Sequence, residues 1–221
     1  MSRPLSGNHD DGGVRRTFQA LKRRGAQVLV VGDVPEDVSR RATRRLLGHP
    51  DEQRHRVLAL NDSRADAADW FPGERTTADD GVALIDRRNL RGGAVADAQA
   101  EPGRPEPAVI RRIDAEIRDW EPDGTPSPAV LRVGVYSLEP LLETRGVDAV
   151  GTLVARLTAA VRRGRGIGHY HLPRAPDAAA VADLESVFDA RVELRSARVG
   201  PEQRWHLPGR PPTDWVALGE P

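Results

Sequence analysis

The chain has 221 residues, of which 33 are basic and 33 acidic, so its formal net charge is zero. A neutral chain has no overall field that draws it to nucleic acid or an anionic membrane, and we expect neither as a partner. The absence of cysteine excludes disulfides, thiol catalysis and thiolate metal ligands. No apolar run approaches the roughly 18 residues of a membrane span. The polar N-terminus also lacks the apolar core of a signal peptide, so we expect a cytoplasmic protein.

The apolar runs predict one α/β domain over residues 25–221, behind a polar tail of residues 1–24 that contains a short helix at 14–24. Short apolar strands alternate with amphipathic helices, a pattern that predicts a parallel sheet with helices on its faces. Segments rich in Gly, Pro and Asp at 89–107 and 121–128 predict surface loops. Along the chain, the expected strands are 27–31, 56–60, 82–86, 130–135 and 166–172, and the expected helices are 35–47, 108–120, 147–161 and 178–188.

The last part of the chain changes character, because three short apolar runs follow one another with no helix between them. These runs are 190–195, 203–207 and 214–218, and Gly and Pro turns separate them. Strands joined by short turns pair antiparallel, so we expect a β-meander that completes the sheet. The predicted fold class is therefore three-layer α/β, with a mostly parallel sheet and a C-terminal antiparallel meander.

The segment from Val28 to Ser39 is built like a phosphate-binding loop that lacks its phosphate-binding residues. An apolar strand ends at Gly32, and Ser39 stands seven residues later, as in the G-x-x-x-x-G-K-[ST] frame. The Gly-Lys positions of that frame hold Asp37 and Val38. Because the lysine is missing and carboxylates face the expected phosphate position, the sequence argues against efficient NTP hydrolysis. Weak phosphate binding at the helix start, through Gly32 and Ser39, is all that this frame predicts.

A later strand ends in Tyr136-Ser137-Leu138. Together, the degenerate phosphate-binding loop, this strand and the terminal meander resemble the RecA/KaiC-like ATPase core. In active relatives an aspartate that manages magnesium and water stands at the position of Tyr136. The resemblance implies a RecA-like fold and, for active members, oligomers that bind ATP at subunit borders. In this chain, only Gly32 and Ser39 match residues of that nucleotide site.

Short strings near the end of the chain, in 188–195, 203–207 and 213–216, are similar to a group of uncharacterised haloarchaeal RecA-like proteins, some of them relatives of halobacterial transducers. The composition agrees with a GC-rich genome, since Lys22 is the only lysine among the basic residues. A haloarchaeon and another high-GC organism both remain open as the source.

The loss of both catalytic elements predicts a domain that does not hydrolyse ATP and acts as a regulatory or protein-interaction module, for example in signal transduction. We therefore expect a protein partner or a homo-oligomer, no catalytic residue and no metal. One alternative is a nucleotide-binding ATPase whose noncanonical loop is completed by a lysine or arginine of a partner subunit. A further alternative is a DNA-associated accessory protein, similar to recombinase paralogues, that binds through the arginines of the helix at 35–47.

Three other groups of side chains are candidates for function. His169 and His171 share one face of a strand by its two-residue period, and His206 could join them in a metal site, although sheet packing is the simpler interpretation. Trp205 and Trp215 could stack a base, but core packing is again simpler. The third group is Glu139 and Glu143, which follow the fourth strand at the sheet edge where α/β proteins bind ligands.

Overall fold

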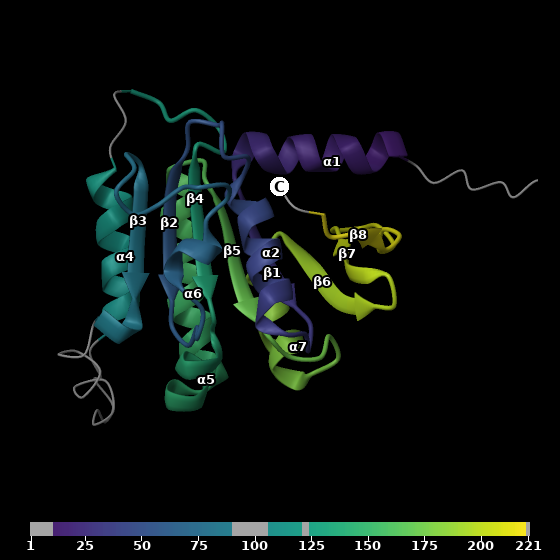
Figure 1. The fold of residues 1–221 in the computed structure, drawn as a ribbon. Coiled ribbons are helices and arrows are strands. Elements are labelled where there is room, and N and C mark those ends of the chain that lie inside the picture. The colour runs from purple at the N-terminus through teal and green to yellow at the C-terminus, as the bar shows by residue number, and fades with distance from the viewer. Residues whose placement is uncertain (1–10, 90–105, 121–123, 220–221) are drawn as a thin grey trace, which may run out of the picture.

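Within the residues that the structure describes, eight strands form a single sheet in the order β3-β2-β4-β5-β1-β6-β7-β8 (Figure 1). The computed structural model describes residues 11–89, 106–120 and 124–219. In this sheet order, the six strands from β3 through β2, β4, β5 and β1 to β6 pair in parallel. The pairs β6–β7 and β7–β8 are antiparallel. The mostly parallel sheet with an antiparallel C-terminal meander is thus confirmed. The strands are β1 (Ala26–Val31), β2 (His55–Leu60), β3 (Val82–Asp86), β4 (Leu131–Tyr136), β5 (Ile167–Leu172), β6 (Ala190–Ala197), β7 (Gly200–His206) and β8 (Val216–Ala217).

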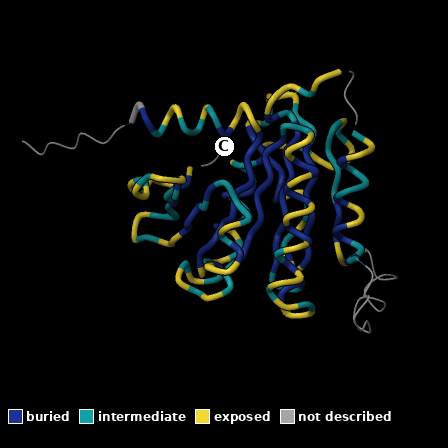
Figure 2. The backbone as a smooth tube through the Cα atoms, turned by 180° about the vertical axis from the view of Figure 1, so that it is seen from behind, coloured by how far each residue is buried: buried dark blue, intermediate teal, exposed yellow. Residues whose placement is uncertain are grey.

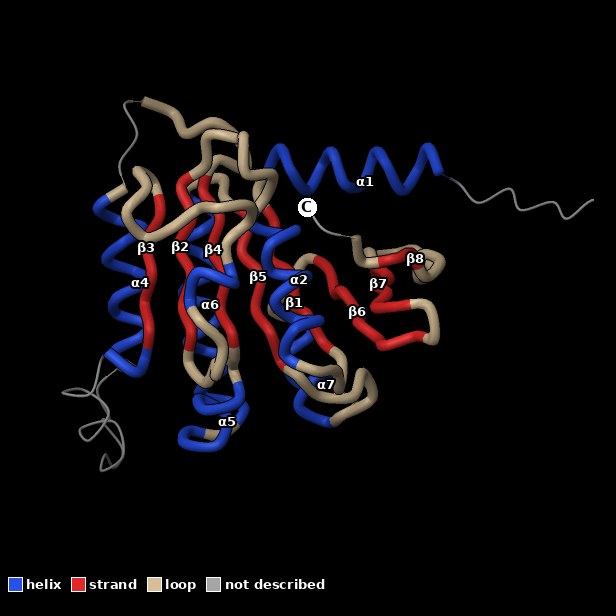
Figure 3. The backbone as a smooth tube through the Cα atoms, in the orientation of Figure 1, coloured by secondary structure: helices blue, strands red, loops and turns tan. Residues whose placement is uncertain are grey.

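Helices cover both faces of this sheet (Figure 3). Three of them pack on one face, where their apolar side chains, together with Leu141 and Leu142 of a short fourth helix, join those of β1, β2, β4 and β5 in the largest core cluster. The opposite face is covered by α2 and by the segment that follows β2. The first group is α4 (Ala108–Asp119), α6 (Val147–Arg163) and α7 (Ala179–Glu185), while α2 spans Glu36–Leu47 and the 3₁₀ turn η1 after β2 spans Ala67–Trp70.

The central strands are buried along their whole length (Figure 2), but they are not uniformly apolar. Side chains that face α4, α6 and α7 are apolar apart from Gln27, which accepts a hydrogen bond from Tyr170 at 3.3 Å, whereas those that face α2 include charged groups. Strand alternation explains the pattern, because every second residue points to the same face. The buried polar residues on the α2 side are Arg56, Arg132, His169 and His171.

Helix α1 (Asp11–Arg24) begins three residues before the expected start and lies across the amino-terminal ends of the strands (Figure 1). Its Leu21 is buried against the first residues of β1, β5 and β6. Phe18 meets the ring of Trp205 edge to face, with the ring centroids 4.9 Å apart. This helix is therefore packed on the sheet through its apolar face.

Other elements differ in length from the prediction. Helix α7 ends at Glu185, because residues after it turn directly into β6, and the short helix α5 (Glu139–Arg145) was not predicted. The 3₁₀ turn η2 (Arg87–Asn89) follows β3. The loops expected at 89–107 and 121–128 lie mostly or partly outside the described residues, as does the start of the polar tail. In the part of the chain that the structure describes, none of the helices has the length and apolar character to cross a membrane.

Candidate functional site

The carboxyl ends of the parallel strands meet at one edge of the sheet, where α/β proteins bind ligands. Helix α2 follows β1 on one face and α7 follows β5 on the other, so the connections after the neighbouring strands β1 and β5 diverge to opposite faces of the sheet. Backbone groups join these two connections, because the N–H of Gly32 donates to the carbonyl of Arg174 at 2.9 Å. Gly32 has φ of 144°, and a Cβ there would lie 2.5 Å from the carbonyl oxygen of Leu194. Only glycine fits this close approach.

The helix after β1 starts early, so the phosphate frame does not form an open loop. Pro35 is the N-cap and α2 begins at Glu36, which places Asp37, Val38 and Ser39 inside its first turns. The Val38 side chain is 4% exposed and packs in the cluster that contains residues of β1 and β6. Ser39 is 2% exposed. The position that the frame assigns to lysine therefore points into the core, and the serine position is also buried.

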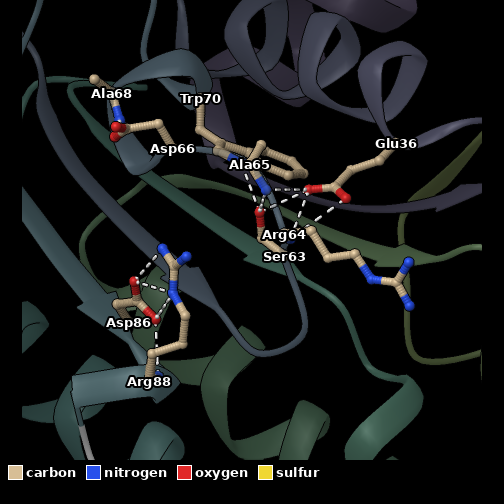
Figure 4. Close-up of polar contacts among 9 residues, drawn as sticks. All are labelled: Glu36, Ser63, Arg64, Ala65, Asp66, Ala68, Trp70, Asp86 and Arg88. Atoms are coloured by element: carbon tan, nitrogen blue, oxygen red, sulfur yellow. Dashed lines mark hydrogen bonds and ion pairs between the residues drawn. The ribbon is translucent and has the colours of Figure 1, made fainter.

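Glu36 joins the first turn of α2 to the loop after β2 (Figure 4). Its Oε1 accepts a hydrogen bond from the Ser63 hydroxyl at 2.7 Å. Backbone N–H groups of Arg64 and Ala65 donate to the same oxygen at 3.2 and 3.3 Å, and the Arg64 N–H also reaches Oε2 at 3.4 Å. One carboxylate thus receives three donor groups from three consecutive residues.

The loop after β2 is anchored separately by the residues that follow. Trp70 is fully buried, donates from Nε1 to Ser63 Oγ at 3.0 Å, and packs on Tyr136 with the ring centroids 4.4 Å apart. Asp66 caps η1 by accepting from the N–H of Ala68. The indole and this cap hold the loop in shape against the sheet.

A second polar group lies beside this loop, at the end of β4. The Ser137 hydroxyl donates to Asp62 Oδ2 at 3.0 Å, and Asn61 Nδ2 donates to the Ser137 carbonyl at 2.8 Å. Although Asp62 is exposed as a residue, partial desolvation of its carboxyl group raises its pKa, and the charges of Glu139 and Glu36 act in the same direction. The hydrogen bond from Ser137 opposes this shift.

Several cations of this edge are already paired with carboxylates. Arg174 binds Glu139 through two nitrogens, at 2.6 and 2.7 Å. Arg40 of α2 lies 2.7 Å from Asp69, as expected for a salt-bridged helix face. The third pair is Arg88 with Asp86 at 2.6 Å (Figure 4), and the arginine lowers the pKa of Asp86. A phosphate at this edge would meet carboxylates together with arginines that have partners.

His169 and His171 share the α2 face of β5, as the strand period predicts. His171 Nε2 and Thr43 Oγ1 of α2 share a hydrogen bond of 2.9 Å, whereas the ring nitrogens of His169 have no hydrogen-bond partner among the described residues. Burial lowers the pKa of both rings, to about 3 for His171. His206 lies on β7, which is separated from β5 by the two strands β1 and β6, and it bonds to Glu193 at 2.8 Å. The three histidines therefore do not converge, and the described residues contain no metal-binding group of His, Cys, Asp and Glu side chains.

The two tryptophans of the meander have different surroundings. Trp205 is partly buried and packs on Phe18. Trp215 lies outside the core, with the guanidinium carbons of Arg195 and Arg204 at 4.0 and 4.6 Å from its ring centroid. It lines an open cleft of about 610 Å³ beside β6. Core packing thus accounts for Trp205 but not for Trp215.

Sequence reasoning missed the contact between Glu36 and the loop after β2. The sequence signal that could have pointed to this loop is Asn61-Asp62-Ser63, a polar run of turn-forming residues at the end of a buried strand. The partner on α2 is 27 residues away from Ser63 in the chain. No local pattern predicts such a contact.

The fold and this edge define an α/β protein in which the second half of a phosphate-loop frame, Glu36 to Ser39, belongs to a helix. The model of DUF7504, a family of unknown function, matches residues 25–194, and the chain belongs to that family. The match runs from the start of β1 into β6. The search of curated proteins found no match to this chain.

Proposed function

We propose that this protein is a RecA/KaiC-like domain that does not hydrolyse ATP and serves as a regulatory protein-interaction module. The burial of Val38 carries the proposal, because a phosphate-binding lysine cannot replace a side chain that packs in the core. Glu36 and Asp37 add two carboxylates to the first turn of α2. A helix N-terminus favours anions, but these side chains already supply negative charge there.

Phosphate release from magnesium-ATP tests the absence of hydrolysis. We expect the purified protein to match a protein-free blank at both low and molar salt. A Ser39→Ala variant distinguishes a contaminating ATPase from activity of the frame, because contamination is unaffected by the substitution. Release by the wild type that is lost in Ser39→Ala would contradict the proposal.

Sedimentation velocity tests the interaction role in its simplest form, self-association. A homo-oligomer predicts a sedimentation coefficient that rises with protein concentration. A monomer at all concentrations would leave another protein as the partner, to be sought by crosslinking in extracts. Extract crosslinking that also captures nothing specific would count against an interaction module.

A second candidate function is association with nucleic acid, and helix α1 favours it. Its five basic side chains are exposed, and the helix itself carries no acidic residue from Gly13 onward, although Arg24 lies 3.5 Å from Asp189. Phosphate binding would make affinity for a DNA duplex fall steeply with salt. Arg15→Glu with Arg16→Glu should abolish such binding, whereas Arg112→Glu on α4 should not. The basic residues of α1 are Arg15, Arg16, Lys22, Arg23 and Arg24.

A further inference from the structure

The loop of residues 63–65 offers only hydrogen-bond donors to Glu36. These donors are the Ser63 hydroxyl and the backbone N–H groups of Arg64 and Ala65, all within 3.4 Å of the carboxylate. Successive backbone N–H groups that point to one place form a concavity suited to anions. Hydrogen bonds to an ionised acceptor are also stronger than those to a neutral one.

Contacts that do not involve Glu36 also hold this loop. Ser63 Oγ accepts hydrogen bonds from Trp70 Nε1 at 3.0 Å and from the Ala65 N–H at 3.2 Å. Trp70 itself is fully buried, and Asp66 fixes the next turn. The donors therefore keep their places when the Glu36 side chain swings away. Glu36 is half-buried on the helix surface, where its side chain can rotate toward solvent.

We propose that residues 63–65 form an anion receptor, that Glu36 is its built-in occupant, and that a carboxylate of a partner protein binds there by displacing Glu36. The inference rests on the proposed interaction role and names the chemistry of one contact. Asp62 and Asp66 adjoin the receptor in sequence, so a singly charged carboxylate suits it better than a phosphate group of charge about −1.5 to −2. The exposed Arg64 supplies positive charge at the rim.

Removing the occupant tests the receptor directly. Glu36→Ala should lower the melting temperature by several degrees, and sodium acetate should restore at least half of that loss in a saturable way, relative to sodium chloride of equal ionic strength. Glu36→Gln should lose stability without responding to acetate. Wild type and Glu143→Ala, an exposed carboxylate on α5, should show no saturable acetate effect. Sodium phosphate should restore less than acetate.

Two outcomes of the melting experiment would overturn the receptor. Equal acetate effects in Glu36→Ala and Glu143→Ala would show a general salt effect. A Glu36→Gln variant as stable as the wild type would show that a neutral hydrogen-bonding side chain serves as well as a carboxylate, so that the loop has no preference for an anion.

A separate outcome concerns the kind of anion. If phosphate restored the melting temperature of Glu36→Ala more than acetate does, the assignment to a carboxylate would be contradicted.

Displacement in the intact protein needs a separate measurement, which also serves if Glu36→Ala does not fold. Acetate is titrated into ¹⁵N-labelled wild type while the amide signals of Arg64 and Ala65 are followed. These two signals should shift saturably, with an apparent Kd at least tenfold weaker than in Glu36→Ala because Glu36 competes. Unchanged signals would overturn displacement. Nucleotide binding would contradict the proposed function yet leave this titration unaffected, so the two failures can be told apart.

Discussion

Buried polar side chains on the α2 face of the sheet are the residues whose protonation matters most for stability. His169 is fully buried and lies against Gly134, where an added Cβ would lie 2.7 Å from its Nε2. His171 is held by Thr43 of α2. Because burial lowers the pKa of both rings, both are neutral in the folded protein at neutral pH. They charge freely, with a pKa near 6.5, only after unfolding.

We predict that the protein loses stability as the pH falls below about 6.5. The unfolded state then binds protons that the folded state excludes, so the free energy of unfolding decreases by up to about 1.4 kcal/mol per pH unit for each histidine. For His171 this loss continues toward its folded pKa of about 3. Urea unfolding at pH 7.5, 6.0 and 5.0 measures the effect in a range where carboxylates of ordinary pKa remain ionised.

A His169→Gln variant tests whether His169 contributes to this pH dependence of stability. It should reduce the dependence on pH between 7.5 and 5.0, whatever its effect on stability at pH 7.5. Equal slopes in wild type and His169→Gln would contradict the prediction.

At the scale of elements, the start of α2 decides what the phosphate frame can do. Val38→Lys is predicted to lower the free energy of unfolding by about 3 kcal/mol, because an ammonium group replaces a packed apolar side chain. Asp37→Lys, at an exposed position of the same turn, should cost about 1 kcal/mol or less. Urea unfolding of the two variants compares them. A Val38→Lys variant that is as stable as the wild type and binds ATP would contradict this prediction. It would show that the segment works as a phosphate loop once its lysine is present.

Helix α1 gives a second prediction for a single element. Phe18→Ala should destabilise the protein by about 2 kcal/mol, since it removes a partly buried ring and its edge contact with Trp205. Gln19→Ala on the exposed side should be nearly neutral. Urea unfolding followed by tryptophan fluorescence tests both variants. A neutral Phe18→Ala would mean that α1 contributes little to the fold.

The sequence predicts the long, periodic elements well, because their apolar spacing is local information. β1, β2, β3, β5 and α2 match the expected ranges within about two residues. Helix α5 was missed, since seven residues are too few to show a helical period. The shared face of His169 and His171 followed from strand alternation, but the hydrogen bond between His171 and Thr43 did not. That contact, like the one between Glu36 and Ser63, depends on how distant segments pack.

For the whole molecule, zero net charge conceals an uneven distribution. Exposed basic residues of α1 lie across the amino ends of the strands (Figure 1), whereas Asp33, Glu36, Asp62 and Glu139 lie at or near the carboxyl ends. Polyanions should therefore be disfavoured at the edge that holds the phosphate frame. This distribution agrees with the proposed loss of nucleotide chemistry and with the proposal that nucleic acid binds at α1.

Calorimetric titration with magnesium-ATP and magnesium-ADP measures whether the carboxyl edge of the sheet holds a nucleotide. The burial of Val38 and the carboxylates of the first turn predict no heat of binding up to millimolar nucleotide, at low salt and at molar salt alike. Asp37→Lys, which adds an exposed cation beside the frame, serves as a control and should also remain without nucleotide binding. Micromolar binding by the wild type would contradict the account, because it would show that this edge holds a nucleotide despite its buried frame.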